Sequence, residues 1–138
     1  MKNQKRTVCQ IANRIKGMSR SEAFKSAWAI VKGQAMEKVS GVKYGRRQEA
    51  IRRLERYAPN SVKVQLVREW DNRIDTNAIA VFVSVAGSKS FKMGYLPAAA
   101  AASIAPAIDS GVSIRAAAFK IVGGFMGFSY GLRVVMAA

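Results

Sequence analysis

The side chains with the most obvious chemistry are oxygen ligands that cluster near the middle of the chain. Asp71, Asp75 and Asn77 alternate with other residues much as the ligands of a calcium-binding loop do. The spacing fails in detail, because Arg73 occupies an intermediate ligand position and Phe82 stands where a closing glutamate is needed. The stretch also lacks the glycine that gives such a loop its sharp bend. We therefore predict neither a metal site nor any other cofactor.

Side chains suited to catalysis are scarce. The chain has no histidine and a single cysteine, Cys9, which excludes a Cys/His zinc site, an intramolecular disulfide, and Ser-His or Cys-His nucleophiles. It has no Gly-Lys-Ser/Thr phosphate loop, and Gly123, Gly124 and Gly127 lie between expected strands with no helix behind them. Residue counts alone leave a Ser–Lys dyad open. We predict a protein that is not an enzyme, and the unpaired thiol is typical of a cytoplasmic protein.

The charge of the chain points to a polyanionic partner. There are 23 Lys and Arg residues against 8 Asp and Glu, a net charge of +15 in 138 residues. Solubility alone needs a magnitude of only about 2–8. Nucleic acid is the first candidate and an anionic membrane surface the second. The membrane is disfavoured because no expected helix sets a large apolar face opposite its lysines, and the longest uncharged run contains Pro97 and Pro106.

Basic and aromatic residues recur together at expected strand ends and in glycine-rich turns. They are Lys43 with Tyr44, then Tyr95, and then Phe125 or Phe128. A single-stranded nucleic acid is held by a basic groove and by rings on which bases stack, each stack contributing about 1–3 kcal/mol. Any one of these rings alone is more often a core residue. Their occurrence together in a basic chain favours binding of single-stranded DNA.

One expected helix, at residues 45–58, is crowded with arginine. It carries Arg46, Arg47, Arg52, Arg53 and Arg56. Five like charges on about three turns repel one another without a counter-ion. A solvated face and a face that follows phosphates both stay open, and we expect Arg46 and Arg47 to contact DNA.

Asp75 is unusual in a chain built for phosphates, because a carboxylate repels them. A DNA-binding surface keeps such a residue where a hydroxyl can donate to it, and a terminal 3′-OH is such a donor. The alternative is an Asx-type turn in which Asp75 and Asn77 satisfy backbone amides. The two roles are compatible.

Two segments of the chain resemble the HIRAN domain, a small nucleic-acid-binding module found alone and at the front of chromatin-remodelling-type ATPases. The first matches an acidic-Pro-x-Asn-Pro-Tyr-Asp-x-Asn-Ala-Ile-x-Val pattern through Glu69, Asn72, Asp75, Asn77, Ala78, Ile79 and Val81. The second is Gly94-Tyr95-Leu96-Pro97. The resemblance covers about residues 37–136. It implies an OB-like barrel that binds single-stranded DNA at its 3′ end, as HIRAN domains of the helicase-like transcription factor type do.

The resemblance also implies roles for individual residues. Lys43 and Tyr44 match an Arg-Tyr pair that contacts the terminal nucleotide, and Asp75 matches the acid that recognises the 3′-OH. Tyr95 takes a position held by histidine, and Phe128 matches a stacking phenylalanine.

Three positions depart from the family pattern. Ile74 replaces a base-stacking tyrosine, Arg73 replaces a frequent proline, and Ala98 replaces a Lys or Arg that contacts phosphate. We therefore expect general single-strand binding to survive with weaker selectivity for the 3′ end.

The elements that position these residues predict an α+β fold. Residues 1–36 form a basic extension folded as a helical hairpin: Gly17 ends its first helix, and Ser19 and Glu22 form a capping box on its second. Residues 37–138 form the barrel domain. Apolar alternation predicts strands at residues 39–44, 62–66, 79–85, 91–95, 112–122 and 129–136, and helices at 45–58 and at 97–110, the latter kinked or split at Pro106. Five or six strands and two helices predict a small, partly open, OB-like β-barrel.

We expect a non-catalytic module for single-stranded DNA, and its 3′-OH end, in DNA repair, replication or mobile-element DNA processing. A helicase, a nuclease or a phage protein is the expected protein partner, and the oligomeric state stays open. The alternative is a structural or protein-interaction accessory protein of a phage or mobile-element assembly, in which Phe24 and Trp28 dock a partner. The simpler role for these two rings is packing on the main domain or on a second chain.

Overall fold

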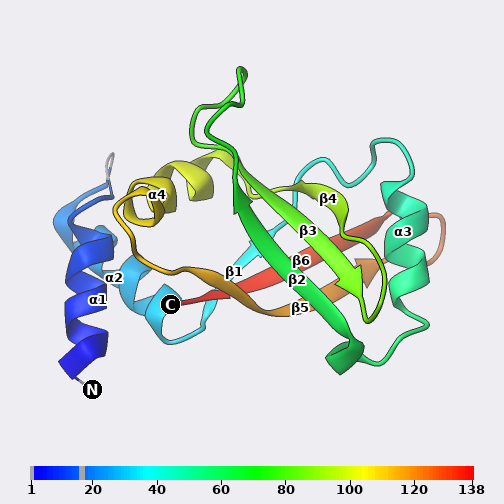
Figure 1. The fold of residues 1–138 in the computed structure, drawn as a ribbon, viewed down its shortest axis with the longest axis horizontal. Helices are drawn as coiled ribbons and strands as arrows, with labels where there is room; N and C mark the ends of the chain where they lie inside the picture. Colours follow the sequence, from blue (N-terminus) through cyan, green and yellow to red (C-terminus); the bar gives the residue numbers. More distant parts are fainter. Residues whose placement is uncertain (1, 16–17) are drawn as a thin grey trace.

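Two antiparallel sheets of three strands each form the centre of the molecule (Figure 1). The computed structural model describes residues 2–15 and 18–138. One sheet has the order β1-β6-β5, from strands Ala35–Lys38, Tyr130–Ala137 and Arg115–Gly123. The other has the order β2-β3-β4, from strands Val62–Arg68, Ile79–Val85 and Phe91–Tyr95. With four α-helices in the same described part, the α+β class is confirmed.

The second sheet forms where the sequence alternates most strongly. The central strand, β3, begins with three buried residues, Ile79, Ala80 and Val81, and β2 and β4 flank it. A strand that is apolar on both faces is stable only when both faces are covered. The three strands occupy the positions where strands were expected, at 62–66, 79–85 and 91–95, so these predictions are confirmed.

The two sheets are joined at one side by a two-residue bridge. The N–H of Ser40 donates to the Tyr95 carbonyl at 2.7 Å, and the N–H of Tyr95 donates to the Ser40 carbonyl at 3.0 Å. Gly94 is required here, because a Cβ atom would overlap the Ser40 carbonyl oxygen. On the opposite side β2 and β5 lie next to each other, and no backbone pairing joins them in the part of the chain described. The sheets thus do not form a closed barrel.

The N-terminal hairpin shares the core of the sheets. Helices α1 (Lys2–Ala12) and α2 (Arg20–Val31) bury Val8, Ile11 and Ile30 in the cluster that contains Leu132 of β6. The Ser19 hydroxyl accepts the Glu22 N–H at 3.2 Å, which confirms the Ser19 half of the predicted capping box. The reciprocal bond from the Ser19 N–H to the Glu22 side chain does not occur among the described residues.

Other expectations for the hairpin have mixed outcomes. Phe24 and Trp28 are half-buried and pack against the chain's own core. The core they pack against is shared by the hairpin and the sheets, and packing on a second chain stays a prediction. The expected helix end at Gly17 lies outside the described residues.

The region between the hairpin and the second sheet differs from expectation. The strand expected at 39–44 is wrong, because β1 occupies Ala35–Lys38, where it pairs with β6. The backbone then turns at Gly41 and Gly45, both with positive φ, and α3 spans only Arg47–Leu54 before a short 3-10 helix, η1 (Pro59–Ser61).

Helix α4 (Ala98–Asp109) was expected to be kinked or split at Pro106. It is one continuous helix through Pro106, so it is not split there. Proline there leaves the Ala102 carbonyl without its usual intrahelical donor, and the following turns nevertheless stay helical. None of the helices in the described ranges combines the length and the apolar character required to cross a bilayer.

Candidate functional site

An open groove of about 1040 Å³ lies between the loop after β1 and the turn that joins β5 to β6. Its walls are residues 38–44 on one side and 122–131, without Gly124 and Met126, on the other, and Pro97 contributes from the start of α4. In Figure 1 the β5–β6 turn lies beside α3, at the far end of the molecule from the N-terminal hairpin.

Three exposed aromatic rings line this groove. The exposed fractions are 72% for Tyr44, 63% for Phe125 and 67% for Phe128. Phe125 and Phe128 meet edge to face with ring centroids 6.1 Å apart. Such exposure of large apolar side chains is costly in water, and it is typical of a surface that a ligand covers.

The charges along the groove have one sign. Lys38 and Lys43 line it, and no Asp or Glu occurs among the lining residues that the structure describes. The groove thus offers ring faces and ammonium groups together, which is the combination that a flexible, negatively charged strand of stacked bases requires.

Gln48, on α3, holds the two walls of the groove together. Its Oε1 accepts the Tyr130 N–H at 2.8 Å, and its Nε2 donates to the Tyr130 carbonyl at 2.8 Å and to the Val42 carbonyl at 3.1 Å. One side chain therefore fixes the β1–α3 loop relative to the start of β6.

The two arginines expected to contact DNA have different positions. Arg47 donates to the Gly41 carbonyl at 2.7 Å, so it braces the loop that carries Lys43 and Tyr44 without lining the groove itself. Arg46 is exposed and lines a separate depression between α3 and the β3–β4 hairpin.

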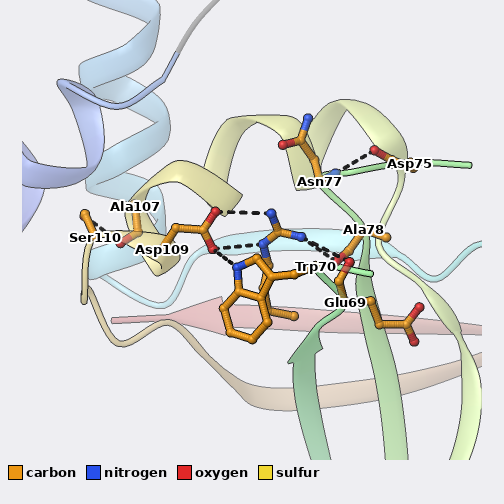
Figure 2. A network of polar contacts seen from close by, with 9 residues as sticks. Glu69, Trp70, Asp75, Asn77, Ala78, Ala107, Asp109 and Ser110 are labelled. Atoms are coloured by element: carbon orange, nitrogen blue, oxygen red, sulfur yellow. Dashed lines mark hydrogen bonds and ion pairs between the residues drawn. The ribbon is translucent and has the colours of Figure 1, made fainter. Parts of the chain in front are cut away.

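The loop between β2 and β3, residues 69–78, contains the second group of predicted site residues. It projects from the sheet next to α4 (Figure 1). Asp75 Oδ1 accepts the Asn77 N–H at 2.9 Å, which confirms the predicted Asx turn at Asp75 (Figure 2). Asn77 contributes its backbone N–H to this turn. Asn72 stabilises the same loop, because its Oδ1 accepts the N–H groups of Ile74 and Asp75 at 3.0 and 2.9 Å.

Tyr95 belongs to a polar network under this loop. Its hydroxyl donates to Glu69 Oε1 at 3.0 Å and accepts from Lys92 Nζ at 3.0 Å, and Lys92 contacts Glu69 Oε2 at 2.7 Å. Asn72 Nδ2 also donates to Glu69, at 3.2 Å. Burial raises the pKa of Glu69, but the hydrogen bonds outweigh it and the pKa lies below its ordinary value. The bond to Glu69 raises the pKa of Lys92.

A second network ties the loop to α4. The Arg68 guanidinium donates to both oxygens of Asp109, at 3.0 and 3.1 Å, and Trp70 Nε1 donates to Asp109 at 2.9 Å (Figure 2). The hydrogen bond from Arg68 lowers the pKa of Asp109. A carboxylate at a helix C-terminus is ordinarily unfavourable, and the arginine offsets that cost.

The predicted site residues therefore fall into two groups. Lys43, Tyr44 and Phe128 share the groove. Asp75, Asn77 and Tyr95 share the loop and its polar network, outside the groove lining. The groups are adjacent through the backbone, because Tyr95 pairs with the groove residue Ser40 and lies two positions before Pro97.

Sequence reasoning missed Gln48 and Lys38. Gln48 gave no signal, because its partner Tyr130 is 82 residues away in the chain. Lys38 was assigned no role because the strand was expected to begin after it. No group of three or more His, Cys, Asp or Glu side chains in the described ranges is placed to hold a metal ion.

Comparison with known proteins identifies the family. A family model described as the HIRAN domain matches residues 37–125, which is more than half of the chain. The matched range includes the β1–α3 loop, the β2–β3 loop and Gly94-Tyr95-Leu96-Pro97, and it ends at Phe125, before Phe128 and β6. Searches of curated proteins and of solved structures gave no match. The chain belongs to the HIRAN family of DNA-binding domains.

Proposed function

We propose that the protein is a non-catalytic module that binds single-stranded DNA in the groove between the β1–α3 loop and the β5–β6 turn. The observation that carries this proposal is the groove itself, in which three exposed rings and two lysines face a space of about 1040 Å³. Bases would stack on Tyr44, Phe125 and Phe128, while Lys38 and Lys43 would neutralise phosphates.

The same chemistry supports a preference for single strands over duplexes. Stacking on protein rings requires base faces that are open, and in a duplex these faces are covered by neighbouring bases. Anisotropy of labelled single-stranded DNA, duplex DNA and RNA at two salt concentrations tests this. We expect the single strand to bind tightest at both salts; tighter binding of duplex would contradict the proposal.

Recognition of the 3′-OH would use Asp75. One carboxylate oxygen of this half-buried residue accepts the Asn77 N–H, and in the described part of the chain nothing bonds to the other. The base of the loop is close to the groove, because Leu96, next to the groove residue Pro97, donates its N–H at 3.0 Å to the carbonyl of Ile79, the residue that follows the loop. A strand leaving the groove past Pro97 could thus present its terminal hydroxyl to Asp75.

Oligonucleotides that end in 3′-OH or 3′-phosphate test this step. We expect the parent protein to prefer the hydroxyl, and Asp75→Ala to lose the preference. Asp71→Ala, an exposed acid in the same loop, is the matched control and should keep it. Equal affinity of the parent for both ends would overturn the 3′-end role, and it would leave groove binding standing.

The proposal extends to the type of fold and to the cellular role of the protein. The bridge between Ser40 and Tyr95 and the proximity of β2 to β5 support a partly open, OB-like barrel over residues 37–138, with 1–36 as an extension. We also propose a cytoplasmic role in DNA repair, replication or mobile-element processing, beside a helicase, a nuclease or a phage protein, and the DNA binding of the family supports this role. The accessory-protein alternative depended on Phe24 and Trp28, which pack on the chain's own core.

A further inference from the structure

The edge strands of the two sheets leave an open seam that the proposed DNA groove does not use. In the part of the chain described, β2 pairs only with β3 and β5 pairs only with β6, so each strand keeps one free edge. Figure 1 shows β2 crossing close to the start of β5. Residues 59–67, except Ser61, and 114–119 line an open cleft of about 770 Å³ between them.

Backbone groups of β2 point into this seam. The N–H of Ala86 donates to the Ser61 carbonyl, and the N–H of Glu69 donates to the Ala78 carbonyl. Odd-numbered residues of β2 are therefore the ones bonded to β3. Because bonded and non-bonded pairs alternate in an antiparallel ladder, Val64 and Leu66 direct their N–H and C=O groups to the free edge.

The same reasoning applies to β5. The N–H of Val39 donates to the Leu132 carbonyl, so even-numbered residues of β6 face β1. Phe119 of β5 is opposite Val134, an even-numbered residue, and it consequently directs its backbone groups away from β6 and toward the seam. Each wall thus offers unpaired donors and acceptors of the kind to which an added strand pairs. Because β2 and β5 already lie next to each other, the added strand would pair with one of the two edges, and we assign it to the free edge of β2.

The side chains of the seam define what such a strand would contain. Val64, Leu66 and Phe119 are half-buried and make its floor apolar. Lys63 and Arg115 are exposed at its rim, and no Asp or Glu occurs among the described lining residues. We propose that the seam binds an extended segment of a partner protein, with alternating apolar and acidic residues, as an additional β-strand.

Other occupants fit less well. A second copy of this chain carries a net charge of +15, so two seams facing each other would repel. DNA would find no exposed ring to stack on, because Phe119, the aromatic residue of the seam lining, is packed against the core.

A synthetic peptide provides the test. The probe is a fluorescent seven-residue peptide that alternates valine or isoleucine with glutamate, and its control has the same composition with the apolar and acidic residues in two blocks. We expect the full chain to bind the alternating peptide at least tenfold tighter than the control. Binding of the two with equal affinity would overturn the proposal, because a strand presents alternate side chains to one face.

Charge reversal tests the rim. The double variant Lys63→Glu and Arg115→Glu should weaken binding of the acidic peptide by about tenfold, and it should gain affinity for the same peptide with lysine in place of glutamate. Both residues are exposed, so folding should be unaffected. Failure of this exchange of specificity would contradict a role for the rim.

Amide hydrogen exchange locates the peptide. Val64 and Leu66 should exchange more slowly when peptide is bound, while the loop around Tyr44 is unchanged. Protection of these amides that rises with protein concentration, without peptide, would show a second copy in the seam and overturn the proposal.

Competition of the peptide with single-stranded DNA, together with loss of peptide binding in Tyr44→Ala, would place the peptide in the groove and also overturn the proposal.

Discussion

At the scale of single residues, Glu69 connects the β2–β3 loop to the sheet below it. It receives hydrogen bonds from Lys92, Asn72 and Tyr95 at 2.7–3.2 Å, and its side chain is only 18% exposed. A carboxylate with three donors is well stabilised in its charged form. Because Asn72 in turn accepts the Asp75 N–H, we expect the position of the Asx turn at Asp75 to depend on a charge that acid removes.

Stability should consequently fall in acid. The pKa of Glu69 is lower in the folded protein than in the unfolded chain, where it is about 4.3. The Glu69 carboxylate therefore contributes its full share of the free energy of unfolding above about pH 4.3, and this share is lost as the pH falls through the folded pKa. Asp109, whose pKa the bond from Arg68 lowers, acts in the same direction. We expect Glu69→Gln to lose about 1–3 kcal/mol of unfolding free energy at pH 7 and to depend less on pH below about 4.5.

Urea unfolding at pH 7, 4 and 3 measures this effect. The matched control is Glu55→Gln, an exposed glutamate with no side-chain bond in the described structure, and it should keep the parent's pH dependence. A Glu69→Gln variant whose stability declined in acid as steeply as the parent's would show that the network contributes little.

A second prediction at the residue scale concerns the effect of replacing Gln48 on stability and on DNA affinity. Replacement by alanine removes three hydrogen bonds and leaves the Tyr130 N–H without its partner, which should cost about 2–3 kcal/mol. Because Gln48 holds both walls, single-strand affinity should fall as well. Urea unfolding and anisotropy check the two effects, with Gln34→Ala, an exposed glutamine after α2, as the control. Unchanged affinity in a folded Gln48→Ala variant would mean that the walls are held in another way.

At the scale of elements, the β5–β6 turn is the part that presents two of the three rings. Gly124 and Gly127 both have positive φ, +78° and +80°. A Cβ atom at Gly124 would overlap the Tyr130 ring, whereas one at Gly127 would meet nothing within 4 Å. A substitution at either glycine would therefore meet the same backbone strain, and the two positions differ in their surroundings.

Replacing each glycine by alanine separates the cost of the backbone conformation from the cost of a steric clash with the Tyr130 ring. Gly127→Ala should cost about 1 kcal/mol through its backbone conformation alone. Gly124→Ala should cost more, and it should weaken DNA binding further, because the Tyr130 ring or the turn must move. Thermal unfolding and anisotropy compare the two variants. Equal effects would show that the Tyr130 contact does not fix the turn.

The scale of elements also explains what sequence could predict. Strands β2, β3 and β4 follow from local alternation, and their residues were predicted closely. β1 was misplaced because its position is set by pairing with β6, about a hundred residues later. Tyr95 was expected as a ring at a strand end, but Glu69, 26 residues earlier, engages its hydroxyl in a polar network. Contacts between distant residues decided these positions, and periodicity does not report them.

At the scale of the whole molecule, we expect the net charge of +15 to supply much of the affinity for any polyanion. If about five phosphates are neutralised, log affinity for single-stranded DNA should fall with log salt at a slope of about −3 to −4. Lys43→Ala should reduce the magnitude of the slope by about 0.7, because one phosphate contact is lost. Lys5→Ala, exposed on α1, is the control and should leave the slope unchanged. A response that is flat in salt would exclude the electrostatic mechanism.

The groove is tested most directly by removing its rings and measuring the affinity for single-stranded DNA at one fixed salt concentration. The double variant Tyr44→Ala and Phe128→Ala should bind more than about tenfold more weakly than the parent, since each stack contributes about 1–3 kcal/mol. Tyr57→Ala is the matched control, because Tyr57 is also exposed, at 49%, but lies outside the groove. We predict parental affinity for this control. A double variant that binds as tightly as the parent would contradict the account.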